Sequence, residues 1–91
     1  MTGMRNRMSV SFDPAAWEDY LYWQQHNPVI FQRINTLIGE IQQNPHTLWR
    51  KSALLGDDFT RVRSLRINLE HRLIYGIQNN TLLVLQCRYH L

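Results

Sequence analysis

Residues 69–91, LEHRLIYGIQNNTLLVLQCRYHL, carry the pattern that decides the fold of this chain. Two apolar runs flank the pair Asn79-Asn80, and a polar pair between apolar runs is typical of a β-hairpin turn. We therefore predict a hairpin whose turn spans residues 78–81. Basic or titratable residues lie at the outer end of each strand, namely Glu70, His71 and Arg72 on the first and Arg88, Tyr89 and His90 on the second.

The length of the turn decides which of these side chains share a face. A two-residue turn gives cross-strand partners whose residue numbers sum to 159, and it places Arg72 and His90 on opposite faces. One extra residue in the turn, as in a bulged loop, gives a sum of 160. Glu70 then lies opposite His90 and Arg72 opposite Arg88, all on one face. Shared chemistry at these residues requires the second register, which we adopt as the prediction.

Two helix-start signals precede the hairpin. Asp13-Pro14 and Asn27-Pro28 each place a capping residue before a proline, and Asn44-Pro45 ends the second helix. The first helix carries a stripe of Trp17, Tyr20, Leu21 and Gln24. The second carries a stripe of Ile30, Ile34, Leu37, Ile38 and Ile41. Because both stripes follow a helical period, we expect them to face the core of an antiparallel helical hairpin.

The remaining segments complete the order of elements. Residues 8–12 alternate weakly, and residues 59–69 mix β-branched residues with arginines, so both indicate strands. Residues 45–58 have no clear period and predict a long loop with one helical turn over 52–55. The order β-α-α-β-β-β is typical of an α+β fold, with a helical hairpin packed on a small, mostly antiparallel twisted sheet.

The composition is that of a globular chain. Its 91 residues are 44% apolar, and we expect a flexible N-terminal extension over 1–7 and a single domain over 8–91. No apolar run approaches the ~20 residues of a membrane span, and no segment resembles a signal peptide. Cys87 is the single cysteine and lies within an apolar strand pattern, which favours a buried thiol over a reactive one. We therefore expect a cytoplasmic protein without a membrane partner.

Positive charge is concentrated in the second half of the chain. Residues 1–45 have a net charge of −1, whereas residues 46–91 carry seven Arg or Lys against three Asp or Glu. Nearly all of these cations are arginines, whose planar guanidinium groups bind phosphate at two points. A solvated basic face and a polyanionic partner both explain this composition, and both stay open at this stage.

Metal and cofactor chemistry have little support in the sequence. The chain contains no glycine-rich phosphate loop, no CxxC motif and no HExxH motif. Its four histidines fall in four different predicted elements: His26, His46, His71 and His90. We therefore expect no metal site and no cofactor.

The ends of the hairpin suit cleavage of RNA without a metal ion. In that reaction the 2′-hydroxyl loses a proton, the departing 5′-oxygen gains one, and arginines stabilise the charge on phosphorus. Histidine suits the proton transfer because it titrates near neutrality. The candidate residues are Arg66, Glu70, His71, Arg72, Arg88, Tyr89 and His90. Paired surface charges explain the same pattern, so the residues alone leave both explanations open.

Four motifs resemble the YoeB (Txe/YoeB) toxins of the RelE/ParE superfamily: WEDYLYWQ (17–24), INTLIGEIQQNP (34–45), INLEHRLIYGI (67–77) and CRYH (87–90). The resemblance runs from about Met8 to the end of the chain. It implies the toxin of a bacterial toxin–antitoxin pair, which cuts messenger RNA in the ribosomal A site and leaves a 2′,3′-cyclic phosphate. It also implies a YefM-like antitoxin as the inhibitory partner, and homodimers are common in the family.

The resemblance also assigns roles by position. Arg72 corresponds to the arginine that stabilises the transition state, and His90 corresponds to the general acid. Arg66 corresponds to a phosphate-binding arginine, and Lys51 corresponds to a lysine of the family's basic loop. Three further residues complete the expected substrate-binding set: Arg63, Arg88 and Tyr89.

The chain departs from the family pattern in and around that loop. The catalytic glutamate of the family, its general base, corresponds to Ala53, which cannot accept a proton. A loop lysine corresponds to Gly56, a tryptophan to Arg63, and the terminal tyrosine to Leu91. The candidate substitute bases are Glu70, Asp57 and Asp58, although Glu70 also suits an ion pair with Arg72.

Three functions stay open on this basis. The first is an active endoribonuclease toxin that acts on the ribosome. The second is a weakened relative that binds the ribosome or an antitoxin without efficient cleavage, which the alanine at position 53 favours. The third is a ParE-type toxin with a target such as DNA gyrase, and the terminal RYH argues against it because that branch needs no terminal histidine.

Overall fold

Two long helices, one short helix and five strands follow one another in the computed structural model, which describes residues 8–51, 53–55 and 62–89. The elements are β1 (Ser9–Phe12), α1 (Pro14–His26), α2 (Pro28–Gln43), α3 (Pro45–Lys51), β2 (Ala53–Leu55), β3 (Val62–Arg66), β4 (Arg72–Gln78) and β5 (Thr81–Gln86). The predicted extension over 1–7 lies outside the described residues, and the prediction of a single domain over 8–91 stays a prediction.

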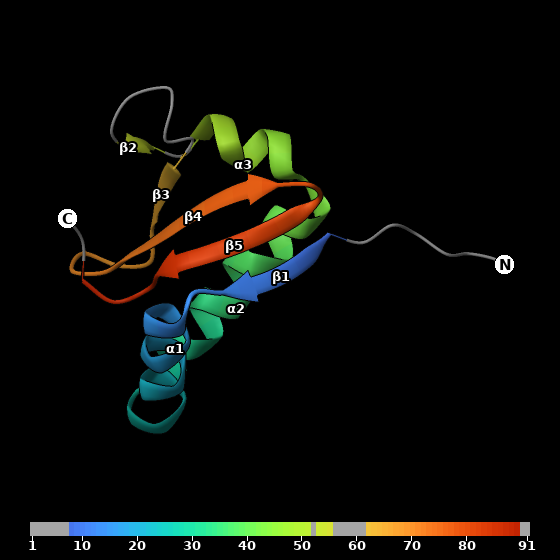
Figure 1. The fold of residues 1–91 in the computed structure, drawn as a ribbon. Coiled ribbons are helices and arrows are strands. Elements are labelled where there is room, and N and C mark those ends of the chain that lie inside the picture. The colour runs from blue at the N-terminus through green and yellow to red at the C-terminus, as the bar shows by residue number, and fades with distance from the viewer. Residues whose placement is uncertain (1–7, 52, 56–61, 90–91) are drawn as a thin grey trace, which may run out of the picture.

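The strands form one mixed sheet in the order β1-β5-β4-β3-β2. β1 is parallel to β5, and the other three pairings are antiparallel. Figure 1 shows α1 and α2 as an antiparallel pair packed on one face of this sheet. β2 has only three residues, so the four longer strands and the two long helices reproduce the predicted β-α-α-β-β-β order, and the α+β prediction is confirmed.

Both long helices begin where the sequence predicts. Pro14 and Pro28 occupy the first helical position, which tolerates proline because its missing N–H would have no intrahelical partner. The Asn27 side chain accepts a hydrogen bond from the Ile30 N–H at 3.2 Å. Asp13 takes the corresponding position in α1, but its side chain makes no capping hydrogen bond.

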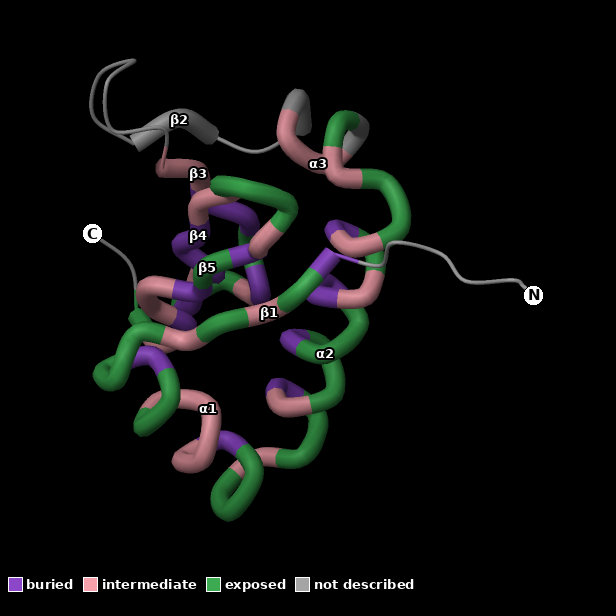
Figure 2. Tube along the Cα trace, turned by 45° about the vertical axis from the view of Figure 1, so that its right-hand side comes forward, coloured by how far each residue is buried: buried purple, intermediate pink, exposed green. Residues whose placement is uncertain are grey.

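The core lies between α2, α1 and the helix-facing side of the sheet. Every residue of the stripe predicted for α2 is buried (Ile30, Ile34, Leu37, Ile38 and Ile41), and Figure 2 shows the corresponding purple band. The sheet contributes Leu65, Leu73, Tyr75, Leu82 and Val84, and Cys87 follows directly after β5. The free thiol of Cys87 is buried, as predicted.

The stripe predicted for α1 is only partly right: Tyr20 packs against the core, but Trp17 does not belong to the buried set. The buried residues of this helix are Ala16 and Trp23, whereas the predicted core residue Trp17 is 45% exposed. Trp17 lies against the rings of Phe12 and Tyr20, with centroids 5.2 and 5.5 Å away. An aromatic-rich helix has no single apolar stripe, so its packing partners decide which rings are buried.

The hairpin between β4 and β5 has the predicted turn residues but a different turn length. Gln78 pairs with Thr81, so the turn has two residues, Asn79 and Asn80, both with positive φ (53° and 57°). The extra residue that we placed in the turn lies instead within β5. Tyr75 pairs with Val84, and the next residue of the ladder, Ile74, pairs with Gln86. Leu85 therefore has no partner on β4 and forms a β-bulge.

The bulge changes the faces of the residues that follow it. Pairs on the turn side of Leu85 sum to 159, whereas Ile74↔Gln86 sums to the predicted 160. Cys87 therefore enters the core, and Gln86 lies with Ile74 on the opposite face. The register that we adopted is therefore wrong for the four pairs nearest the turn and holds only at Ile74↔Gln86. β5 ends at Gln86, so the predicted pair of Arg72 with Arg88 is not part of the ladder, and the Arg72 N–H bonds to Tyr89 instead.

The segment predicted as a loop is structured differently. Residues 45–51 form α3, and residues 53–55, which we predicted as a helical turn, form β2 against β3. Trp49 of α3 packs edge-on against Tyr75 of the sheet, with ring centroids 5.8 Å apart. Long-range contacts of this kind are invisible to a search for local periodicity.

Candidate active site

Arg66 of β3 and Arg72 of β4 lie on the sheet face opposite α1 and α2. Leu65 and Leu73 belong to the core beneath the helices, and side chains alternate between faces along a strand. Their neighbours therefore form a second face, which we call the arginine face: Ser64, Arg66, Arg72 and Ile74. Two of the predicted site residues, Arg66 and Arg72, are thus brought together.

Arg72 is held in place by its neighbour on β3. Its Nε donates a hydrogen bond to the Ser64 hydroxyl, and its Nη2 donates to the Ser64 carbonyl oxygen at 3.3 Å. Ser64 is 1% exposed, and Arg72 is half-buried. A guanidinium anchored on one edge retains N–H groups on its other edge, which can bind an anion.

Arg66 and Arg72 are direct cross-strand partners. Like charges that face each other on a sheet lower stability, typically by ~0.2–1 kcal/mol. Arg66 is exposed, so water screens part of this repulsion in the free chain. An anion bound between the two guanidinium groups would replace the repulsion with attraction, which makes this pair a candidate phosphate-binding site.

The end of the described chain returns to the same strand. The Arg72 N–H donates to the Tyr89 carbonyl oxygen at 2.9 Å, and the Tyr89 N–H donates to Nδ1 of His71 at 2.6 Å. Tyr89 has a φ of 65°, a left-handed conformation that costs a non-glycine residue roughly 1–2 kcal/mol. Its side chain is 57% exposed. These contacts place Tyr89 beside Arg72, as the predicted site requires.

Trp23 of α1 fixes the residue where this returning segment begins. Its indole N–H donates to the Cys87 carbonyl oxygen at 2.9 Å, in a buried contact. The Cys87 thiol lies 3.7 Å from the Ala16 carbonyl oxygen, and burial first and Asp19 second raise its pKa to about 12. The thiol is therefore protonated and packed at neutral pH, so it serves the core and not the chemistry.

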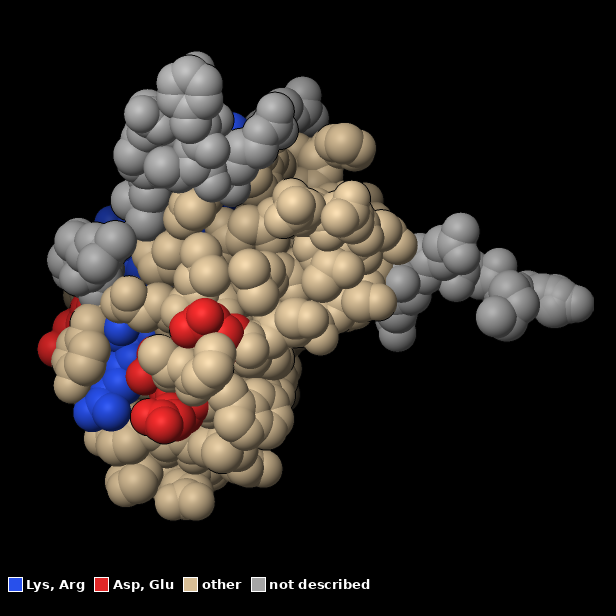
Figure 3. Space-filling view, viewed as in Figure 1, with Lys and Arg blue, Asp and Glu red and all other residues tan. Residues whose placement is uncertain are grey.

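Arg88 does not join the two arginines. Its guanidinium lies over the ring of Tyr22, 3.6 Å from the centroid, and 4.9 Å from the ring centroid of Tyr89. Asp19 is also nearby: burial raises the pKa of this carboxyl, and the charge of Arg88 partly offsets that effect. Figure 3 shows basic side chains beside acidic ones near α1, on the side of the molecule where the C-terminus lies.

Arg63 is also separated from the arginine face. It pairs with Tyr75, whose side chain is in the core, so it points to the helix side of the sheet. Its guanidinium carbon lies 4.6 Å from the ring centroid of Trp49. Strand alternation explains this separation, because Arg63 is an odd number of residues from Arg66.

The other predicted residues are only partly described. Glu70 is exposed, and its backbone N–H donates to the Asn68 side chain at 2.9 Å. Lys51 ends α3, but its side chain is not described. His90, Asp57 and Asp58 lie outside the described residues.

Position 53, where the resemblance places the missing general base, is the register partner of Ser64. Because cross-strand partners have side chains on the same face, an acidic residue at this position would lie on the arginine face.

His71 belongs to the predicted set of site residues, but the sequence suggests no role for it. The structure shows a buried ring, 7% exposed, packed edge-on against Trp23 with centroids 4.7 Å apart. Its position directly before Arg72 was the available signal. Burial of the ring was not readable from the sequence, because its partners lie in α1 and at the chain end.

Two negative findings concern the described residues. None of their helices is long and apolar enough to cross a membrane, and no cluster of three or more His, Cys, Asp or Glu among them could hold a metal ion.

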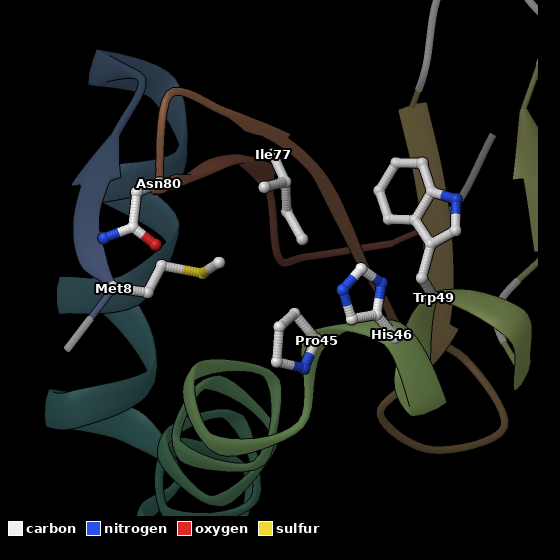
Figure 4. Close-up of a pocket in the computed structure, with 6 residues that line it drawn as sticks. All are labelled: Met8, Pro45, His46, Trp49, Ile77 and Asn80. Carbon is white, nitrogen blue, oxygen red and sulfur yellow. The ribbon is translucent and has the colours of Figure 1, made fainter. Parts of the chain in front are cut away.

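A cavity of about 400 Å³ lies away from the arginine face. Figure 4 shows it between α3, the start of β1 and the turn end of the hairpin, lined by Met8, Pro45, His46, Trp49, Ile77 and Asn80. None of the predicted site residues lines it, so it does not mark the candidate active site.

Comparison with known proteins identifies the family that this architecture matches. Residues 12–91 match the family model of the YoeB-like toxin of bacterial type II toxin–antitoxin systems. Toxin RelK of Mycobacterium tuberculosis is 42% identical over 82 residues, which cover 90% of this chain and 96% of RelK.

Two solved structures from Staphylococcus aureus are similar across almost the whole chain. The YoeB dimer superposes with a TM-score of 0.83 and 35% identity, covering 93% of this chain and 99% of that one. The YoeB–YefM complex gives a TM-score of 0.80 and 37% identity over the same shares of the two chains.

Proposed function

The chain belongs to the YoeB-like toxins of bacterial type II toxin–antitoxin systems, and we propose that it inhibits translation by cutting messenger RNA in the ribosomal A site. The observation that carries this proposal is the cross-strand pair Arg66↔Arg72, with one guanidinium anchored on Ser64 and Tyr89 hydrogen-bonded beside it. Two facing arginines suit the phosphates of an RNA chain, and the exposed ring of Tyr89, near His71 and Arg88, can stack on a base.

The proposed reaction is an in-line displacement at phosphorus. The 2′-oxygen loses its proton and forms a bond to phosphorus, while the bond from phosphorus to the 5′-oxygen breaks. The Arg72 guanidinium stabilises the charge that develops on the phosphoryl oxygens, and Arg66 holds the adjacent phosphate. His90 gives its proton to the departing 5′-oxygen, which leaves a 2′,3′-cyclic phosphate and a 5′-hydroxyl.

The general base is the weak element of this site. Alanine at position 53 cannot take the 2′-hydroxyl proton, and loss of one acid–base partner typically lowers a rate about 10²–10⁴-fold. Glu70 is the described candidate for a replacement, since it is exposed and precedes Arg72 by two residues. Asp57 and Asp58 are further candidates.

A second function follows from the same position. In this second function, the chain binds the ribosome or its antitoxin through the arginine face but cleaves messenger RNA poorly, because position 53, the partner of Ser64, has no carboxylate. Binding to 70S ribosomes without appearance of new messenger ends would support this function. A natural chain as lethal as its Ala53→Glu variant would contradict it.

An antitoxin is the proposed inhibitory partner. The S. aureus toxin is known in complex with YefM, so we expect a YefM-like protein whose acidic segment covers the arginine face. Restored translation on addition of such an antitoxin tests this partner. The S. aureus YoeB dimer motivates a homodimer of this chain, which sedimentation analysis would test.

Induction of the chain in a sensitive bacterium, followed by primer extension on messenger RNA, tests the main proposal. New 5′ ends should appear within translated codons, and they should be absent after induction of a His90→Ala variant. Equal cleavage by the two chains, or cleavage by neither, would overturn the proposed ribonuclease function.

A further inference from the structure

A buried histidine lies beneath the returning end of the chain. The backbone around His71 is held by three hydrogen bonds: its N–H donates to the Asn68 side chain at 2.7 Å, and its carbonyl oxygen accepts from the N–H groups of Ile67 and Asn68 at 2.9 and 3.2 Å. Its ring packs against Trp23. The imidazole therefore has a fixed position and orientation before any substrate binds.

Both polar backbone groups of Tyr89 are bound to two consecutive residues of the sheet. The Tyr89 N–H donates to Nδ1 of His71, and the Tyr89 carbonyl oxygen accepts from the N–H of Arg72. We call these two hydrogen bonds the tail anchor. They fix the peptide groups on both sides of the Tyr89 Cα atom, and they accompany its left-handed φ of 65°.

The tail anchor specifies one chemical form of the imidazole. A backbone N–H can only donate, so Nδ1 of His71 must accept and carries no proton. The ring proton of the neutral imidazole is then on Nε2. Protonation of Nδ1 would set two donors against each other, so the tail anchor requires this tautomer.

We propose that His71 is a positioning residue for the ribonuclease reaction, because its Nδ1 holds the C-terminal segment beside Arg72. The inference rests on the proposed function for its catalytic meaning. The side chain of Arg72 donates a hydrogen bond to the Ser64 hydroxyl, and its backbone N–H donates to the Tyr89 carbonyl oxygen. Arg72 therefore links the proposed phosphate-binding guanidinium to the returning end of the chain. His90 follows Tyr89 directly in sequence, and the direction in which the chain leaves Tyr89 depends on the tail anchor.

Nuclear magnetic resonance of the full chain tests the hydrogen bond without reference to activity. With ¹⁵N labelling, the ring nitrogens of His71 should show Nδ1 unprotonated and Nε2 protonated. A scalar coupling across the hydrogen bond should connect the Tyr89 amide nitrogen to Nδ1 of His71. A protonated Nδ1, or a Tyr89 amide that exchanges with solvent as fast as an unstructured peptide, would overturn the inference.

A pair of substitutions separates the acceptor from the volume of the ring. His71→Asn retains an oxygen near the place of Nδ1, whereas His71→Leu retains apolar bulk without an acceptor. We expect the Leu variant to cleave messenger RNA at least ~10-fold more slowly and its Tyr89 amide to exchange at least ~10-fold faster, with most of both effects reversed in the Asn variant. Equal loss in two folded variants, or no loss in either, would overturn the inference.

His26→Leu provides the matched control. Nδ1 of His26 also contacts a backbone group, the Tyr22 carbonyl oxygen at 3.0 Å, but this histidine is exposed at the end of α1. Its removal should change neither cleavage nor Tyr89 exchange. If the natural chain cleaves no messenger, the proposed function fails by itself, and the tautomer, the coupling and the exchange of the Tyr89 amide still decide the tail anchor.

Discussion

The two ends of the β4–β5 hairpin are built by different means. At the turn end, Gln78 pairs with Thr81, and the two asparagines take the positive φ values that a two-residue turn requires. At the other end the ladder is interrupted by the Leu85 bulge. There Trp23 and Arg72 donate hydrogen bonds to the returning chain, and Nδ1 of His71 accepts one from it.

The two ends of the hairpin differ in whether their contacts are local or long-range in sequence. The turn end depends on residues next to one another in the chain, so it forms from local preference. The site end combines α1, the 67–71 segment and the chain terminus, whose contacts are far apart in sequence. Substitutions at the site end should therefore change activity, whereas those at the turn end should change only stability.

The largest effect is expected from restoring an acid at the site end. Ala53→Glu places a carboxylate beside Ser64 and should raise messenger cleavage about 10²–10⁴-fold, because a positioned base takes the 2′-hydroxyl proton. Primer extension on a defined messenger with purified ribosomes measures the rate. Ala53→Gln has a similar shape without the base and should show no gain; equal rates for the two variants would remove the proposed role of position 53.

Loss of the anchored guanidinium should be next in size. Arg72→Ala is expected to lower cleavage about 10²–10³-fold in both the natural and the Ala53→Glu chains, because charge on phosphorus is no longer stabilised. The same ribosome assay measures this loss. Arg33→Ala removes an exposed arginine from α2 and should have no effect; a similar loss in both variants would indicate dependence on overall charge instead of the site.

Two substitutions of Tyr89 test whether its backbone conformation matters. Tyr89→Gly keeps the N–H and adopts positive φ freely, whereas Tyr89→Pro has no N–H and cannot adopt a φ near 65°. Both lose the aromatic ring. We expect the proline variant to cleave at least ~10-fold more slowly than the glycine variant in the same assay. Equal rates would show that the chain end does not need this conformation.

A change at the turn end should leave activity untouched. Asn80→Gly removes the side chain that makes positive φ costly, and Asn-Gly is the preferred pair for this turn. Urea denaturation should show a free energy of unfolding higher by about 0.5 kcal/mol. Messenger cleavage should be unchanged, and a large change in cleavage would contradict the separation of the two ends.

We expect the smallest effect, a change in the pH dependence of stability, from Asp19 of α1. Burial raises the pKa of Asp19 above its usual 3.8, so its contribution to stability is present at low pH and is lost as the pH rises through the raised pKa. Asp19→Asn should remove that loss while still accepting a hydrogen bond from the Cys87 N–H. Urea denaturation at pH 3 and pH 7 measures the free energy of unfolding of both chains. If the Asn variant lost as much stability between these pH values as the natural chain, the predicted contribution of Asp19 would be wrong.

Local pattern was sufficient for part of this molecule. The apolar stripe of α2, the proline starts of both long helices and the position of the hairpin turn, though not its length, all depend on residues within one or two turns of chain. The pair Arg66↔Arg72 was partly accessible, because both residues belong to predicted strands and the resemblance singled out both. Their direct register became visible only when the strands were paired.

Local pattern did not distinguish between like residues of one element that end in different environments. Trp17 and Trp23 are both large aromatic residues of α1, yet only Trp23 meets the end of β5 and is buried. Arg63 and Arg66 are both arginines of one strand, yet alternation sends the first to Trp49 and the second to the arginine face. Arg88 likewise lies over Tyr22 and not beside Arg72.

The order of the two long helices and the four longer strands, and the arginine-rich character of the second half of the chain, were readable from the residues alone, because helical period, turn chemistry and side-chain type are properties of short segments. The place of the bulge, the strand at position 53 and the burial of His71 became visible only in the folded chain. Each of these depends on which distant surfaces pack together, and such packing is a property of the whole core and not of any one segment.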